Sequence, residues 1–378
     1  MKKLNYAKYL ITKELLPLFI VFTVIGLISY FAYLMNVDFY DPYYNEISLA
    51  ALNGPMMAFA IVLPLFIFNY KYSLKRSDTY YQLPLKQGEL KNIRIISGLF
   101  ILVVSYLIAS LLPYVSFVIR YVSAPETKTW ASITYFKYFE AAPYLGAIVV
   151  GLFTIVIEYF ISCFFCSLTS KPVSALILNI SLQLVLSFSL YVVFKSIYNL
   201  NYYNFAGDLS HIDDAANISI LYSPGVVTVI GLPDHIARVY AFDLNSIYAI
   251  EGSSANAIFT LCNVLEVLVG ALACFFTLFR KDNSGENCNN YGFANKKLNS
   301  LFFLSTIPVA LFVIVQNPYF GFEIIIGTVI VAAAYYFLFA LFIGSFKMPG
   351  YSYAIIGAMS ALVIFGCLFF AATTKTLI

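Results

Sequence analysis

Charged residues are scarce in this chain of 378 residues: only 11% are Asp, Glu, Lys or Arg, and the formal net charge is +3. This excludes a sizeable soluble domain, and the near-neutral balance gives no basic surface for nucleic acid. Hydrophobic residues, by contrast, make up 61% of the chain, and the mean hydropathy is +0.84. An ordinary globular protein has about 45–50% apolar residues. The composition therefore predicts an integral membrane protein.

Sequence motifs for catalysis are also missing. There is no GxxxxGK[ST] phosphate loop, no HExxH or GxSxG motif and no kinase-type set of residues, so the chain does not bind ATP through a phosphate loop. The six cysteines do not suggest a disulfide framework, because five lie in apolar runs. Cys163 and Cys166 form a CxxC pattern without a second ligand pair, so we interpret them as buried thiols. We expect no catalytic residue, metal or bound cofactor in this chain.

Long apolar runs indicate the fold class. A helix needs about 20 mostly apolar residues to cross the hydrocarbon core of a bilayer. The first such run follows a lysine-containing segment, is too long for a signal peptide and lacks a cleavage site, so we predict a retained helix. The prediction is an all-α, polytopic membrane protein of about nine spans, at 15–35, 49–70, 95–119, 141–168, 173–194, 255–279, 300–316, 323–343 and 353–372.

Positive charge predicts the orientation, because cytoplasmic loops retain Lys and Arg. A cytoplasmic N-terminus places 16 of the 22 basic residues inside, whereas 12 of the 19 acidic residues then lie outside. The expected organisation is a cytoplasmic interfacial helix over 1–14, five spans over 15–194, an external loop over 195–254 and four spans over 255–378. Within the external loop, residues 218–233 are apolar but too short to cross, which favours a re-entrant hairpin. His211 and His235 lie in the same loop, at a spacing that matches no zinc signature.

The loop over 71–94 differs from a plain connector. It begins with basic residues and continues with apolar Leu83, Leu85 and Leu90 set among polar neighbours. Such a surface suits headgroups or a soluble partner, although a solvated basic loop that only follows the charge rule is the alternative.

Two acidic residues fall inside predicted spans, Glu158 in the fourth and Glu266 in the sixth. An acid at the centre of a membrane helix costs about 2.5–3.5 kcal/mol on insertion scales, so such residues usually face a bundle interior or a water path. We expect them to line a translocation path and to contact a cationic group of the substrate, with Gln183 of the fifth span as a polar neighbour. The alternative is a hydrogen-bonded packing contact.

The loop over 71–94 also carries a family resemblance. The stretch from Arg76-Ser77 through Tyr80, Leu83-Pro84 and Lys86 to Leu90 resembles the first cytoplasmic loop of ABC-2-type permeases, the membrane subunits of ATP-binding-cassette exporters, in their Gram-positive bacterial branch. Leu221-Tyr222-Ser223-Pro224 is similar to a Leu-Ser-Pro segment ahead of span six in that family. The polar loop from Arg280 to Phe293 is similar to a third family stretch, but has Cys288-Asn289 where Ala-Gly is usual.

The resemblance implies a division of labour. A separate cytosolic ATPase would hydrolyse ATP, a second permease subunit, identical or related, would complete the path, and the pair would lie in the bacterial plasma membrane. The substrate would be exported, and a drug or an antimicrobial peptide would suit the acidic residues. The residues implied in ATPase docking are Tyr80, Leu83, Pro84, Leu85, Lys86, Glu89 and Leu90.

Other functions remain open. A membrane-embedded polysaccharide polymerase would have a similar arrangement of spans and one large external loop, but that loop holds little basic charge here. An ion-driven carrier would use Glu158 and Glu266 without an ATPase, although no internal repeat is visible. A sensor or immunity protein that binds antimicrobial peptides overlaps with the exporter interpretation.

Overall fold

The computed structural model describes five helical segments in detail. The described residues are 2–37, 40, 49–72, 87–130, 133–136, 141–169, 172–173, 175–180 and 253–279, with isolated positions at 233, 329, 333, 336, 337, 340, 353, 354, 357 and 361. Most of them are helical, and four helices are long and apolar enough to cross a membrane.

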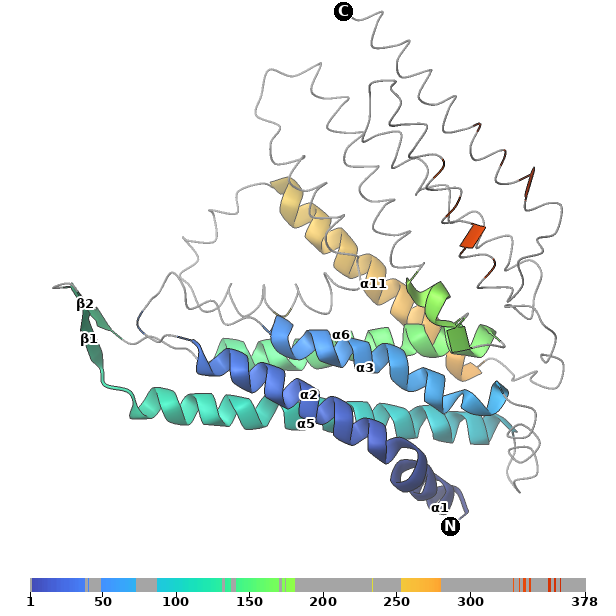
Figure 1. Ribbon diagram of the computed structural model, residues 1–378, viewed down its shortest axis with the longest axis horizontal. Coiled ribbons are helices and arrows are strands. Elements are labelled where there is room, and N and C mark those ends of the chain that lie inside the picture. The colour runs from blue at the N-terminus through green and yellow to red at the C-terminus, as the bar shows by residue number, and fades with distance from the viewer. Residues whose placement is uncertain are drawn as a thin grey trace, which may run out of the picture.

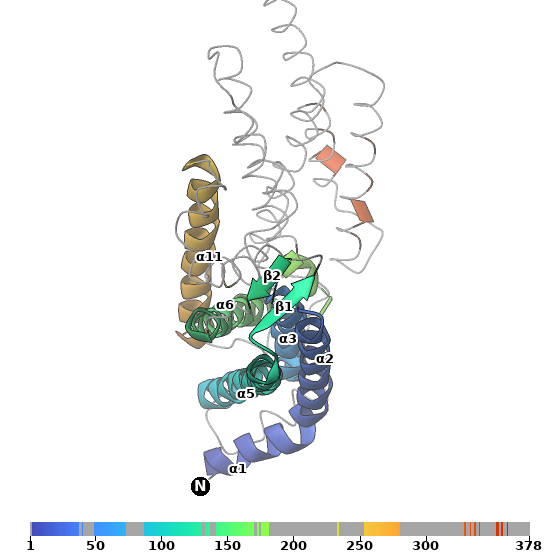
Figure 2. The same ribbon diagram turned by 90° about the vertical axis from the view of Figure 1, so that its left-hand side faces the viewer.

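The first of these helices runs without interruption from Lys3 to Met35 and has three parts. They are α1 (Lys2–Tyr9), a π-helical segment η1 (Leu10–Leu15) and α2 (Leu16–Met35). Figure 2 shows that α1 turns away from the axis of α2. Both a π-helical turn and a proline in the first turn of a helix are known causes of such bends, and this chain has η1 and Pro17 at the junction. The predicted interfacial segment and the predicted first span thus form one bent helix.

The other three long helices are α3 (Ala50–Ile67), α5 (Gln87–Ser123) and α6 (Ala141–Leu168), and α3 is followed by the short 3-10 helix η2 (Asn69–Lys71). At 1.5 Å per residue, even α3 with its 18 residues reaches about 27 Å. These helices coincide with the predicted second, third and fourth spans. However, α5 begins at Gln87 and not at 95, because the charged residues of its first two turns still continue the helix.

The sixth predicted span corresponds to α11 (Ser253–Phe279). Only the start of the fifth lies among the described residues, the last two are represented by isolated helical positions, and the seventh, over 300–316, lies outside the described residues. The all-α prediction missed one hairpin, in which β1 (Thr127–Trp130) pairs antiparallel with β2 (Ile133–Phe136). Its strands are rich in threonine and aromatic residues, which favour strands. The hairpin lies at the opposite end of the helices from α1 (Figure 1).

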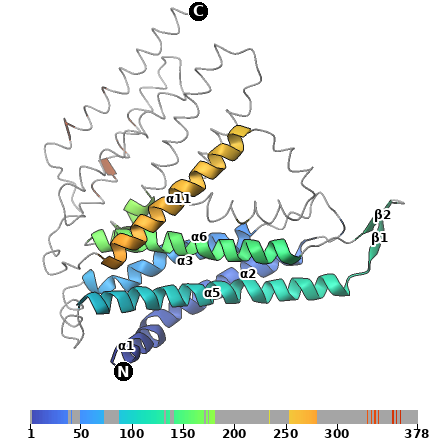
Figure 3. The same cartoon turned by 180° about the vertical axis from the view of Figure 1, so that it is seen from behind.

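A common core joins the helices. α3 packs against α2, α5 and α6, and α11 packs against α6 on the other side (Figures 1 and 3). Fully buried Met56, Phe59 and Leu63 place one face of α3 in this core. Large apolar residues elsewhere are exposed, such as Ile28 of α2 and Ile119 of α5, as expected for helix faces that contact lipid.

Candidate functional site

A line of polar side chains runs along α6. Thr154, Glu158 and Ser162 are four residues apart, a spacing that places them on one helix face. All three are buried, with relative exposures of 3%, 0% and 2%. α6 is otherwise strongly apolar, so this line is the polar exception on a helix suited to a membrane.

The facing side of α11 carries a matching line. Asn263, Glu266 and Thr277 are all buried although α11 is an apolar helix. Gly270 lies between them and faces Ile157 of α6 so closely that an added Cβ would meet the Ile157 Cγ2 at 2.3 Å. The glycine thus lets the two helices approach closely, as small residues do at helix contacts in membranes.

The two acidic side chains predicted from the fourth and sixth spans meet at this contact. The carboxyl groups of Glu158 and Glu266 interact directly, and both residues are almost fully buried. We call them the carboxyl pair. Residues more than a hundred positions apart in the chain are therefore brought together, a contact that the sequence analysis did not predict.

Asn179 completes this site. Its Nδ2 donates to Glu158 Oε1 at 3.2 Å and to Ser162 Oγ at 2.6 Å, and the residue is 2% exposed. The sequence analysis selected Gln183 as the polar neighbour and missed Asn179, although an asparagine within the apolar run over 173–194 was a usable signal. Gln183 lies outside the described residues.

The site brings together two buried carboxyl groups, an amide and a hydroxyl. Two carboxyl groups in apolar surroundings interact with positive charge far more strongly than they would in water. The described residues hold no group of three or more His, Cys, Asp or Glu side chains that could bind a metal ion. The arrangement suits a proton or a cationic group.

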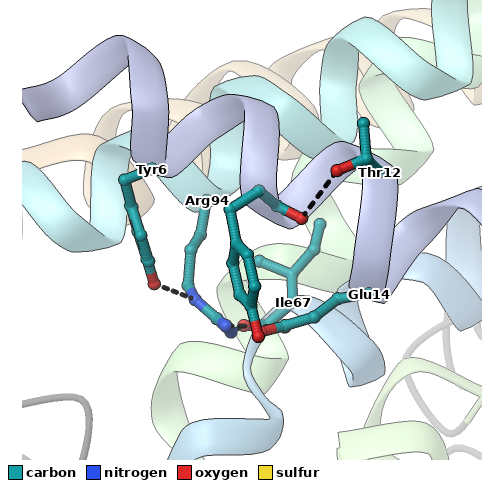
Figure 4. A network of polar contacts seen from close by, with 6 residues as sticks. Tyr6, Thr12, Glu14, Ile67 and Arg94 are labelled. Atoms are coloured by element: carbon teal, nitrogen blue, oxygen red, sulfur yellow. Dashed lines mark hydrogen bonds and ion pairs between the residues drawn. The ribbon is translucent and has the colours of Figure 1, made fainter. Parts of the chain in front are cut away.

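A second polar network lies where α3 ends and α5 begins (Figure 4). Arg94 of α5 donates from Nε to the Tyr6 hydroxyl at 3.0 Å, from Nη1 to the Ile67 carbonyl at 2.8 Å and from Nη2 to Glu14 Oε2 at 2.7 Å. Its guanidinium also lies over the Tyr70 ring, 5.3 Å from the centroid. We call this network the Arg94 junction. It connects four segments, namely α1, η1, the end of α3 with η2, and α5.

Of the predicted docking residues, only Glu89 and Leu90 are among the residues that the structure describes, and both lie in the first turn of α5. Tyr80, Leu83, Pro84, Leu85 and Lys86 are outside the described residues. Glu89 is exposed enough to form an ion pair with Lys3, at 2.9 Å. Leu90 has no exposed surface and belongs to the core, so its side chain supports the helix packing here and does not reach the surface.

Arg94 itself was counted only as a cytoplasmic charge in the sequence analysis. Its role could have been suspected from its place beside an apolar span, because a buried arginine needs several hydrogen-bond partners. The identity of those partners could not be read from spacing, since Tyr6 and Glu14 are 88 and 80 positions away.

Comparisons with known proteins add no relative: no protein-family model, no curated protein and no solved structure matches this chain.

Proposed function

We propose that this chain is the membrane-spanning permease subunit of an ATP-binding-cassette exporter, located in a bacterial plasma membrane with its N-terminus in the cytoplasm. The observation that carries the proposal is the place of the Leu83-Pro84 loop. It connects η2 to α5, and the helices that flank it are joined to each other and to the N-terminal helix by Arg94. A cytosolic ATPase that moves this loop would therefore act on several membrane helices together.

The carboxyl pair supports the transport part of the proposal. Glu158 and Glu266 are buried between α6 and α11, helices that are apolar elsewhere. Buried acids within membrane helices commonly mark substrate or ion paths. In the exporter they would contact a cationic group of the cargo, for example of a drug or an antimicrobial peptide, and a second permease subunit would complete the path.

The first experiment is affinity purification of the tagged protein in mild detergent, followed by mass spectrometry and an ATPase assay. The proposal expects a cytosolic ATPase in stoichiometric amount. Leu83→Asp should remove this partner while leaving the yield of folded permease unchanged, and Gln82→Asp, which adds the same charge at the neighbouring position, should retain it. Purification of a folded protein without any ATPase would contradict the proposal.

An ion-driven carrier is the second candidate, and the direct contact of the two carboxyl groups favours it. A carrier would transport in proteoliposomes that contain this chain alone, driven by an imposed ion gradient. An ionophore would abolish that transport, whereas an exporter would require the ATPase and ATP.

A further inference from the structure

The carboxyl pair holds a proton. Its two side chains are joined by a hydrogen bond and are buried, with 0% of Glu158 and 1% of Glu266 exposed. An ionised carboxylate has only acceptor oxygens, so two carboxyl groups share a hydrogen bond only when at least one of them is protonated. Asn179 Nδ2 donates to Glu158 Oε1, a bond that favours one ionised carboxylate in the pair. The pair therefore contains one proton and one negative charge.

The helices around the pair are poor in positive charge. α3, α6 and α11 contain no Lys, Arg or His, and the Lys and Arg residues of α5 lie near its two ends. Glu266 is the charged side chain that acts on Glu158 from α11, and the segment over 175–180 has no titratable residue. The other buried titratable side chains of α5, α6 and α11, away from the ends of α5, are phenols and thiols, namely Tyr106, Tyr114, Tyr144, Tyr159, Cys163 and Cys166. Among these helices, the charge of the pair is therefore balanced by a proton or by a bound cation.

Two buried carbonyl oxygens beside the pair point to a cationic ligand. The side-chain Oδ1 atoms of Asn179 and Asn263 have no hydrogen-bond donor within the part of the chain that the structure describes. Asn179 is 2% exposed, and its Oδ1 belongs to the amide that donates to Glu158. Asn263 is 9% exposed and lies one helical turn before Glu266. A buried acceptor without a donor is unfavourable, and the N–H groups of a cationic ligand would satisfy it.

Charge balance relates the proton to such a ligand. With one proton the pair carries one negative charge. If a monovalent cation replaces this proton, the two carboxylates and the cation together again carry one negative charge. The exchange thus leaves the net charge of the buried site unchanged, which matters because additional charge is costly in apolar surroundings. A guanidinium group suits the site best, because its forked N–H donors match carboxylate oxygens.

We propose that the carboxyl pair is a proton–cation exchange site, at which a guanidinium or primary ammonium group of the cargo takes the place of the proton held between Glu158 and Glu266. The proton passes from the carboxyl oxygen to water, and the two carboxylates then bind the cation. This inference rests on the proposed function for its cargo, but the proton and its exchange belong to the permease and need no ATPase. Cargo binding is thus coupled to proton release.

Infrared spectroscopy tests for the proton. A protonated carboxylic acid has a carbonyl stretch that differs from that of a carboxylate or an amide, so the difference spectrum between the unmodified protein and Glu158→Gln/Glu266→Gln isolates the pair. We expect the band of a protonated acid for the ligand-free protein in nanodiscs at neutral pH. Glu126→Gln, which changes an exposed acid, should retain this band. A difference spectrum without the band would overturn the inference.

Octylguanidinium tests the exchange, because it keeps its positive charge at neutral pH and so releases no proton of its own. Octylurea, which has a similar shape but no charge, is the matched control ligand. Calorimetry in buffers of different ionisation enthalpy counts the protons released. We expect about one proton per bound octylguanidinium and an affinity that rises about tenfold per pH unit, as competition with a single proton requires. Octylurea should show neither effect.

The variants separate this exchange from binding elsewhere in the nanodisc. Glu126→Gln should behave as the unmodified protein does, whereas Glu158→Gln/Glu266→Gln should lose both the proton release and the pH dependence. The comparison of the two ligands needs only the unmodified protein, so it stays decisive if the double variant folds poorly. Octylguanidinium that binds without proton release, or that does not bind at any pH, would overturn the inference and leave the exporter proposal in place. A permease that shows the exchange but purifies without any ATPase would contradict the proposed function and leave the exchange site in place.

Discussion

Arg94 and Arg120 lie near opposite ends of α5, and each donates to main-chain carbonyls at the end of a neighbouring helix. Arg94 donates to the Ile67 carbonyl, at the last residue of α3, and Arg120 donates to the carbonyls of Met35 and Val37, where α2 ends. The last carbonyls of a helix lack partners within the helix and carry partial negative charge. α5 therefore connects the ends of two other helices through one arginine at each of its own ends.

The carboxyl pair gives the first prediction. Glu158→Gln and Glu266→Gln each keep the approximate shape of the side chain but remove its capacity to carry a negative charge. Both should lower transport by about tenfold or more, as expected when an ion or a cationic group loses a buried charged partner. The measurement is substrate flux in proteoliposomes at matched protein abundance. Exposed Glu126→Gln is the control, and unmodified transport in both variants would show that the pair only supports packing.

Asn179 gives a prediction about stability. Asn179→Leu removes the donor to Glu158 and Ser162 and leaves buried acceptors without it. The loss should be about 1–3 kcal/mol, the usual cost of an unsatisfied buried polar group. Thermal unfolding in detergent would show a lower Tm. Asn36→Leu serves as the control, because Asn36 is exposed and its side chain donates to the carbonyl of Ala32 in its own helix. Equal Tm values for both variants would contradict the prediction.

Gly270, at the close contact of α6 and α11, gives a prediction about stability. Gly270→Ala places a Cβ at 2.3 Å from the Ile157 side chain, so either this side chain or the helices must shift. We expect a loss of about 1–3 kcal/mol from overpacking, partly restored by the additional substitution Ile157→Ala. In α3, Gly54 has open space around it, and Gly54→Ala should leave stability unchanged or raise it by about 0.5–1 kcal/mol. The Tm values of the two single variants and the double variant are compared in a double-mutant cycle. If Ile157→Ala does not raise the Tm of Gly270→Ala, the result would argue against this contact.

Leu90 and its neighbour Glu89 should behave differently although both belong to the predicted docking segment. Leu90→Asp buries a charge in the core and should cost about 3–5 kcal/mol, enough to reduce the folded yield sharply. Glu89→Gln removes the exposed ion pair with Lys3 and should change stability by less than about 1 kcal/mol. Fluorescence-detected size-exclusion chromatography would measure both yields. Normal yield of Leu90→Asp would mean that Leu90 is not a core residue.

The hydropathy of the sequence predicted most of the described helices. The segments at 15–35, 49–70, 141–168 and 255–279 were placed within a few residues, because length and apolar content alone satisfy the requirement for a membrane helix. The start of α5 was predicted too late, since a hydropathy criterion excludes the charged first turns in which Glu89 and Arg94 lie. The hairpin over 127–136 was missed for the related reason that the search was for apolar runs alone.

The sequence by itself determined the class of this protein, the approximate limits of its described helices and the presence of two costly acids inside them. Each of these properties depends on one segment at a time. Only the tertiary structure decided that Glu158 meets Glu266 and Asn179, that Leu90 is buried, and that Arg94 holds Tyr6, Glu14 and Ile67 together. These are contacts between distant segments, and they depend on which faces of the helices pack against one another, a choice that many similar apolar faces leave open in the sequence.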